Sequence, residues 1–118
     1  MEVDLYIAGV DDKKVMNCKR MAEAGDAESQ FNLGLSYDYG NGIAVDKREA
    51  FKWYMRAAVQ GDNKSQHNLA NFYYDGEGTA VDKPESIKWW ERAAEQGNTN
   101  AMHSLGVCFY EDDGIVVD

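Results

Sequence analysis

The chain repeats itself every 36 residues, and this period constrains its fold more than any other feature. Gly25, Gly61 and Gly97 each open one copy of the unit. Residues 25–60 and 61–96 are identical at 20 of 36 aligned positions without a gap, and residues 97–118 match the first part of the unit. Repeats of this length are typical of solenoids, in which each unit packs only against its neighbours and the stack presents an extended surface.

The composition predicts a folded chain with a negative surface. Of the 118 residues, 44% are hydrophobic, which is enough to argue against disorder. The net charge of −9 disfavours binding to nucleic acid or to anionic membranes, because both would repel the chain, and it weakly favours basic partners.

The sequence also predicts a cytoplasmic protein with reduced thiols. No apolar run reaches the length of a membrane-spanning helix, and the start Met1-Glu2-Val3-Asp4 lacks the features of a signal peptide. In a linear array Cys18 and Cys108 would lie too far apart for a disulfide, so we expect ordinary thiols in a reducing compartment.

Each copy contains two helical stretches separated by a glycine-containing loop. We expect the first helix of repeat 1 to run from about Ala27 to Tyr39 behind Asp26 as its N-cap, and the second to begin at Asp46. The stretch 11–24 aligns with the second-helix stretches and is predicted to be a capping helix. The predicted organisation is an N-terminal segment and capping helix (1–24), repeat 1 (25–60), repeat 2 (61–96) and an incomplete repeat 3 with its first helix and loop (97–118).

The repeated residues resemble those of the Sel-one-like repeat, a relative of the tetratricopeptide repeat. The matching residues in the first copy are Leu33, Gly34, Tyr37, Gly40, Gly42, Asp46, Ala50, Trp53, Tyr54, Ala57, Ala58, Gln60 and Gly61. The later copies depart from this pattern with Ala70 for glycine, Ser86 for alanine and Asp112 for the first loop glycine.

This resemblance implies an all-α fold, a right-handed superhelix of helix–turn–helix repeats that acts as a non-enzymatic adaptor between proteins. It brings no catalytic motif, no cofactor and no metal. A cysteine-rich Helicobacter branch of the family is linked to β-lactam binding and hydrolysis. That branch carries a cysteine pair in every repeat, which this chain lacks.

The first helices carry a candidate partner-binding stripe. In this family's geometry the first helices line the concave surface, and one of their faces changes identity from copy to copy. Its residues are Glu28, Phe31, Leu35, Asp38, Lys64, His67, Asn71, Tyr74, Asn100, His103, Val107 and Tyr110. Residues released from a common packing role are free to contact a ligand, and aromatic, Asn and His side chains suit a peptide groove. The alternative is a merely solvated stripe with Phe31 and Leu35 packed against neighbours.

The sequence disfavours both a zinc site and a calcium site. His67 and His103 share one column, but zinc needs three or four ligands, and the nearest candidates, Asp75 and Glu111, lie about two turns away. The run 111–114 lacks the alternating ligands and closing Glu of an EF-hand loop.

The remaining large side chains have structural interpretations. We expect Trp53, Trp89 and Trp90 to be packing residues, and Arg56 and Arg92 to have inter-repeat or helix-end partners rather than a phosphate.

The sequence therefore predicts a module that binds a protein or peptide, with basic partners favoured. Two other functions stay open: an immunity or inhibitor protein that neutralises a toxin or enzyme, and a β-lactam-hydrolysing enzyme. Self-association through the C-terminal end is a further possibility, because Leu105 and Phe109 are expected to be exposed where a second helix would lie. Either a continuation of the array or another chain would cover that end.

Overall fold

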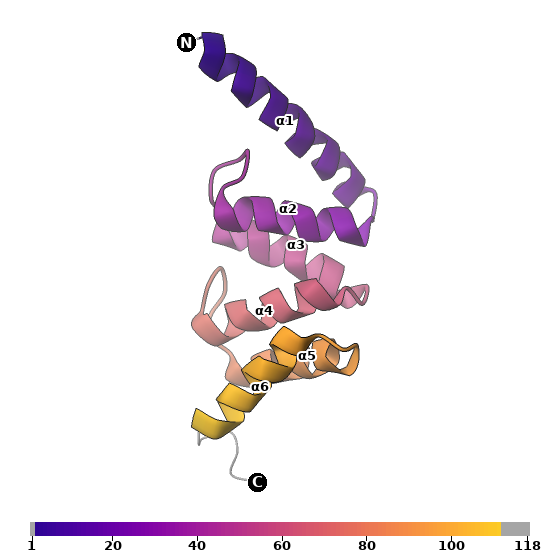
Figure 1. Cartoon of the computed structure of the whole chain (residues 1–118), viewed down its shortest axis with the longest axis vertical. Coiled ribbons are helices and arrows are strands. Elements are labelled where there is room, and N and C mark those ends of the chain that lie inside the picture. Colours follow the sequence, from indigo (N-terminus) through magenta and orange to yellow (C-terminus); the bar gives the residue numbers. More distant parts are fainter. Residues whose placement is uncertain (1, 112–118) are drawn as a thin grey trace.

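The chain folds into six consecutive α-helices (Figure 1). The computed structural model describes residues 2–111, with side chains described for residues 13–110. The helices are α1 (Glu2–Glu23), α2 (Ala27–Tyr39), α3 (Lys47–Val59), α4 (Asn63–Asp75), α5 (Lys83–Glu95) and α6 (Thr99–Glu111). No strand occurs between residues 2 and 111. None of the helices described there is long and apolar enough to cross a membrane.

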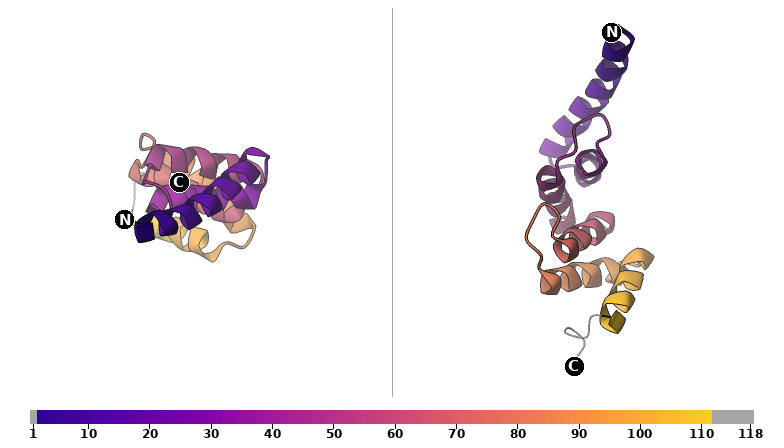
Figure 2. Two further views of the ribbon diagram at one scale, coloured as in Figure 1. Left: turned by 90° about the horizontal axis from the view of Figure 1, so that it is seen from above. Right: turned by 90° about the vertical axis from the view of Figure 1, so that its left-hand side faces the viewer.

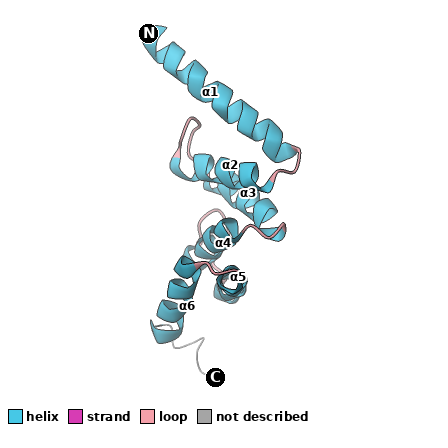
Figure 3. Ribbon diagram, turned by 45° about the vertical axis from the view of Figure 1, so that its right-hand side comes forward, coloured by secondary structure: helices cyan, strands magenta, loops and turns pink. Residues whose placement is uncertain are grey.

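The helices stack in chain order into an elongated body of 59 × 26 × 22 Å. Each pair of consecutive helices from α1 to α6 packs together. The first helices of the repeats (α2, α4, α6) follow one another along one side, and the second helices (α3, α5) follow along the other (Figure 2). We call the former the first-helix side. Short loops join the helices (Figure 3). The arrangement confirms the predicted all-α solenoid.

The helix starts are fixed by side-chain caps at the predicted positions. Each capping oxygen accepts a hydrogen bond of 2.8–3.1 Å from the backbone N–H three residues later. This satisfies a donor that the first turn of a helix leaves unpaired. The caps are Asp26, Asp46, Asp62, Asp82 and Asn98. At Asp26, hydrogen bonds from the Ser29 hydroxyl and amide also lower the pKa of the carboxyl.

Helix α1 is longer than predicted, because it begins at Glu2 rather than near residue 11. Its C-terminal half packs on α2, where the Cys18 thiol contacts the Ser29 carbonyl oxygen at 3.3 Å. Burial raises the pKa of Cys18. Cys18 and Cys108 form no disulfide. The loop predicted for residues 112–118 lies outside the described residues.

Hydrogen-bonded pairs of glutamines connect the first helix of each complete repeat to the ends of the helices before and after it. The Gln30 amide donates to the Ala22 carbonyl oxygen at 2.9 Å and accepts from Gln60 at 2.8 Å. One repeat later, Gln66 and Gln96 form the same 2.8 Å pair. Because Gln30 is only 3% exposed, these bonds satisfy amides that burial would otherwise penalise. The repeated glutamines therefore have a packing role.

The core is a ribbon of equivalent residues between the two rows of helices. Leu33, Leu69 and Tyr54 are completely buried, and Trp53, Trp89 and Trp90 are 4–7% exposed. The predicted packing role of the three tryptophans is thereby confirmed.

The two repeated arginines contact their own helices rather than a neighbouring repeat. The guanidinium of Arg56 lies 4.6 Å from the ring centre of Trp53, and that of Arg92 lies 4.6 Å from that of Trp89. Of the two expected alternatives, an inter-repeat partner or a helix-end partner, the described contacts favour the second. The helix-end interpretation agrees with their place in the last turns of α3 and α5, where a cation is favourable.

Gly34 is required by the approach of an aromatic ring. A Cβ atom at this position would lie 2.6 Å from two carbons of the Tyr54 ring, closer than van der Waals contact allows. At the equivalent position of α6, a Cβ atom on Gly106 would meet no atom within 4 Å. The same glycine therefore has a packing role in repeat 1 that is absent among the described contacts of repeat 3.

We expect Gly34→Ala to lower the free energy of unfolding by about 2 kcal/mol, because the Tyr54 ring must shift out of a close-packed site. Gly106→Ala is the matched control, and we expect a gain of about 0.5–1 kcal/mol from the higher helix propensity of alanine. Urea unfolding followed by circular dichroism measures both changes. A loss of the same size in the two variants would show that the ring contact is not the cause.

Candidate functional site

The structure distributes the predicted stripe over three levels of exposure. Six residues are exposed: Glu28, Lys64, Asn100, His103, Val107 and Tyr110. Five are half-buried: Phe31, Leu35, His67, Asn71 and Tyr74. Asp38 is buried, with 7% of its surface exposed. Exposure along the stripe thus increases from α2 towards α6.

At the α2 end, the stripe residues already have partners within the chain. Phe31 and Leu35 pack against the core, and the ammonium of Lys64 lies 5.6 Å from the Phe31 ring centre. The Asp38 carboxylate accepts a 2.8 Å hydrogen bond from the Tyr54 hydroxyl and also pairs with Lys47.

These contacts shift two pKa values. Burial, reinforced by the hydrogen bond to Asp38, raises the pKa of Tyr54 well above its usual value. The same carboxylate raises the pKa of Lys47. Asp38 is therefore part of a buried polar cluster that links α2 to α3.

The histidine column shows no metal centre. His67 is half-buried, its Nδ1 lies 3.2 Å from the side-chain oxygen of Asn68, and burial lowers its pKa. Across the described part of the chain, no three His, Cys, Asp or Glu side chains come together as metal ligands would. The side chain of Glu111 is outside that part.

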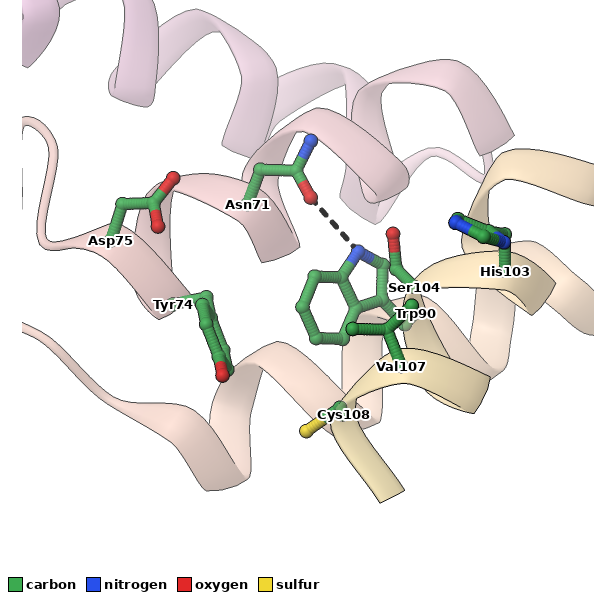
Figure 4. A pocket seen from close by; sticks show the side chains of 8 residues that line it. All are labelled: Asn71, Tyr74, Asp75, Trp90, His103, Ser104, Val107 and Cys108. Carbon is green, nitrogen blue, oxygen red and sulfur yellow. Dashed lines mark hydrogen bonds between the residues drawn. The ribbon is translucent and has the colours of Figure 1, made fainter. Parts of the chain in front are cut away.

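A cavity of about 320 Å³ lies between α4, α5 and α6 on the first-helix side (Figure 4). We call it the Trp90 cavity. Four of its lining residues belong to the predicted stripe: Asn71, Tyr74, His103 and Val107. The others are Asp75, Trp90, Ser104 and Cys108.

A hydrogen bond and a tilted contact between aromatic rings hold the wall of the Trp90 cavity in place. The Trp90 indole N–H donates to Asn71 at 3.1 Å, as the dashed line in Figure 4 marks. The Tyr74 ring centre lies 5.4 Å from that of Trp90, and the Lys83 ammonium lies 4.8 Å from the Tyr74 ring centre. The Asp75 side chain is exposed and forms no hydrogen bond or ion pair with any described residue. The cavity therefore combines ordered aromatic rings with an unpaired carboxylate.

A second cavity, of about 190 Å³, occupies the equivalent place one repeat earlier, between α2 and α4. We call it the Phe72 cavity. It shares Asn71 and Asp75 with the Trp90 cavity, so the two adjoin along the first-helix side. On its rim, Lys47 pairs with Asp38 and lies 3.6 Å from the Glu77 carboxylate. Its lining residues are Asp38, Tyr39, Lys47, Asn68, Asn71, Phe72, Asp75 and Glu77.

A further cavity of about 610 Å³ lies beside α1 and α2 and contains no residue of the stripe. Its lining residues are Lys14, Val15, Cys18, Asn32, Ser36, Asn41 and Gly42. Neither ring stacking nor an ion pair organises these residues in the described contacts.

Two solved structures with a similar architecture are repeat proteins. A protective antigen of uropathogenic Escherichia coli strains, displaying an SLR fold, is 37% identical with a TM-score of 0.81; the alignment covers 83% of this chain and 21% of the antigen. A Sel1 repeat protein from Oxalobacter formigenes is 35% identical with a TM-score of 0.79, over 80% of this chain and 28% of that one. This chain therefore spans only 21–28% of the length of these relatives.

A third structure supports the fold alone. Cysteine-rich protein B of Helicobacter pylori is 23% identical with a TM-score of 0.73, and the alignment covers 77% of this chain and 68% of that protein. A comparison with curated protein sequences found no match.

The Sel1 repeat family model matches three consecutive segments, residues 27–62, 63–98 and 99–118. Together these segments include the Trp90 cavity, the Phe72 cavity and the whole predicted stripe. Sel1 repeats are generally protein-interaction modules. The chain belongs to the Sel1 repeat family.

Proposed function

We propose that this chain is a non-enzymatic interaction module that holds a segment of a partner protein along its first-helix side. The observation that carries the proposal is the pair of adjoining cavities on successive first helices, joined through Asn71 and Asp75. Clefts with ordered apolar walls and a few polar groups are the usual sites of ligand binding. A run of such clefts along stacked repeats suits an extended segment.

The charge of the first-helix side favours a basic partner. Asp75 lines both cavities and Glu77 lines the Phe72 cavity. Lys47 lies beside Glu77, whereas Asp75 has no described cation. The chain as a whole carries a net charge of −9. An excess of one sign speeds association with a partner of the opposite sign. A cytoplasmic location belongs to the same proposal, because cysteines that form no disulfide are typical of reducing compartments.

A quantitative pull-down with paired variants tests the proposal. The double variant Val107→Ser/Tyr110→Ser removes two exposed apolar side chains, 41% and 90% exposed, from the first-helix side. The control Val59→Ser/Val81→Ser removes two exposed apolar side chains, 65% and 58% exposed, elsewhere on the surface. We expect one or more proteins of a source lysate to be retained by wild type and by the control, and lost from the first variant.

Equal retention by both double variants would contradict binding on the first-helix side. Sedimentation of the purified protein over a range of concentrations accompanies the pull-down. If loss of Tyr110 lowered self-association instead of partner retention, the exposed residues of α6 would serve as a contact between copies, and the proposal would be wrong in its choice of partner.

A further inference from the structure

The Trp90 and Phe72 cavities lie at overlapping positions of successive repeats, because five of the eight lining positions of one recur in the other after a shift of 36 residues. Moving back by the period of 36 residues places Trp90 on Tyr54 and Cys108 on Phe72. Both members of each pair are buried. The two cavities differ in volume, about 320 Å³ against 190 Å³.

The difference in volume agrees with the size of the residue that faces the ring of the second helix, Phe72 in one repeat and Cys108 in the next. In the earlier repeat, the Phe72 ring packs edge-on against Tyr54, with ring centres 5.3 Å apart and planes at 82°. An edge-to-face arrangement is a preferred geometry for an aromatic pair. In the later repeat, the small side chain of Cys108 occupies the position of Phe72. Among the described residues, the only ring that contacts Trp90 is that of Tyr74, on α4.

We propose that the Trp90 cavity receives an aromatic side chain of a basic segment of a partner protein, with the ring taking the place that Phe72 fills one repeat earlier. The inference rests on the proposed function and specifies the chemistry of the partner. An aromatic ring would supply the edge that Trp90 lacks from α6, and it would bury a large apolar area at low entropic cost.

Asp75 selects the charge of the partner residue that lies next to the inserted aromatic ring. This carboxylate lies in the wall between the two cavities and has no described partner. A residue adjacent to the inserted ring therefore meets a negative charge at the mouth of the cavity. Lysine or arginine at that place gains an ion pair, and a carboxylate is repelled. The partner segment thus carries a basic residue beside its aromatic one.

Titration with short peptides, followed by the NMR signal of the Trp90 indole N–H, tests this inference. The probe is an acetylated and amidated Gly-Arg-Phe-Arg-Gly peptide. We expect a saturable shift of that signal, and at least about tenfold weaker binding when the Phe is replaced by Ala, because most of the buried apolar contact is lost. Replacement of both Arg by Glu is expected to weaken binding as well. Equal binding by the Ala peptide would overturn the aromatic assignment.

The decisive variant is Cys108→Phe, which supplies the ring from the chain itself. We expect a folded protein with a raised Tm and no measurable binding of the Phe peptide, because the cavity is filled as it is at Phe72. Cys108→Ala is the matched control and should bind the peptide as wild type does. Peptide binding by a folded Cys108→Phe variant would overturn the inference. Should that variant fail to fold, Val107→Trp narrows the cavity from its exposed rim and must give the same loss of binding.

Charge recognition is tested by Asp75→Asn, with Glu95→Gln on α5 as the control of equal charge change. Only the former is expected to weaken binding of the arginine-containing peptide, and equal weakening would show a general effect of net charge.

The inference and the proposed function fail in distinguishable ways. Retention of the pulled-down partner by Cys108→Phe but not by Val107→Ser/Tyr110→Ser would leave the first-helix side as the binding site and refute the aromatic pocket. Retention by both would refute both.

Discussion

Gly78→Ala is expected to lower the free energy of unfolding by about 3 kcal/mol or more, combining a backbone penalty with a steric clash. Gly78 has φ of +68°, in the left-handed region that side chains disfavour. A Cβ atom there would also lie 2.3 Å from the Lys47 carbonyl oxygen and 2.8 Å from its carbonyl carbon. Because these are backbone atoms, the clash cannot be relieved by a change of rotamer. Equilibrium unfolding in urea gives the change directly.

Gly61→Ala is the control that separates the two costs. Gly61 also has a positive φ, +104°, but a Cβ atom there would meet no atom within 4 Å. We expect a loss of about 1–2 kcal/mol, from the backbone conformation alone. Losses of equal size at Gly61 and Gly78 would mean that the close approach of Gly78 to the Lys47 backbone does not contribute to the loss of stability.

The contact at Gly78 matters for the binding side as well as for stability. It places the loop after α4 against the first residue of α3, and Lys47 extends from there to both Asp38 and Glu77. The rim of the Phe72 cavity is therefore fixed by the stacking of one repeat's loop on the preceding repeat. A variant that disturbs this contact is expected to alter that rim before it alters the Trp90 cavity.

The sequence was sufficient to predict the helices because their signals are local. Asp26 and Asp46 cap helices that begin one residue later, and Gly40 has the positive φ that ends α2. The N-terminal helix was underestimated because residues 1–10 lie before the first aligned stretch and have no second copy for comparison. Its start at Glu2 could not be obtained from the repeat.

The candidate site depended on contacts between helices and was predicted less completely. Variation between copies led to Tyr74 and Val107, which line the Trp90 cavity. The same variation also selected Asp38. This residue is buried, because Tyr54 from within α3 and Lys47 from the start of α3 both contact its carboxylate. Cys108 was not selected, because it lies in a buried column. The replacement of Phe72 by Cys108 was visible in the sequence, but that it opens a cavity beside Trp90 follows only from the packing.

Leu69→Ala is expected to cost about 3–5 kcal/mol, and Leu105→Ala only about 1 kcal/mol, although the two leucines occupy the same position of the repeat. Leu69 is completely buried on α4, which packs between α3 and α5, whereas Leu105 is half-buried on α6, whose main described packing is on α5.

In a stacked array each residue is stabilised only by its neighbours, so the cost of a cavity should be lower on a helix whose described packing is mainly on one neighbour. Urea unfolding of the two variants at one protein concentration provides the comparison. Costs of equal size would mean that α6 is covered in solution. An increase in the cost of Leu105→Ala with protein concentration would then identify the cover as a second copy of the chain.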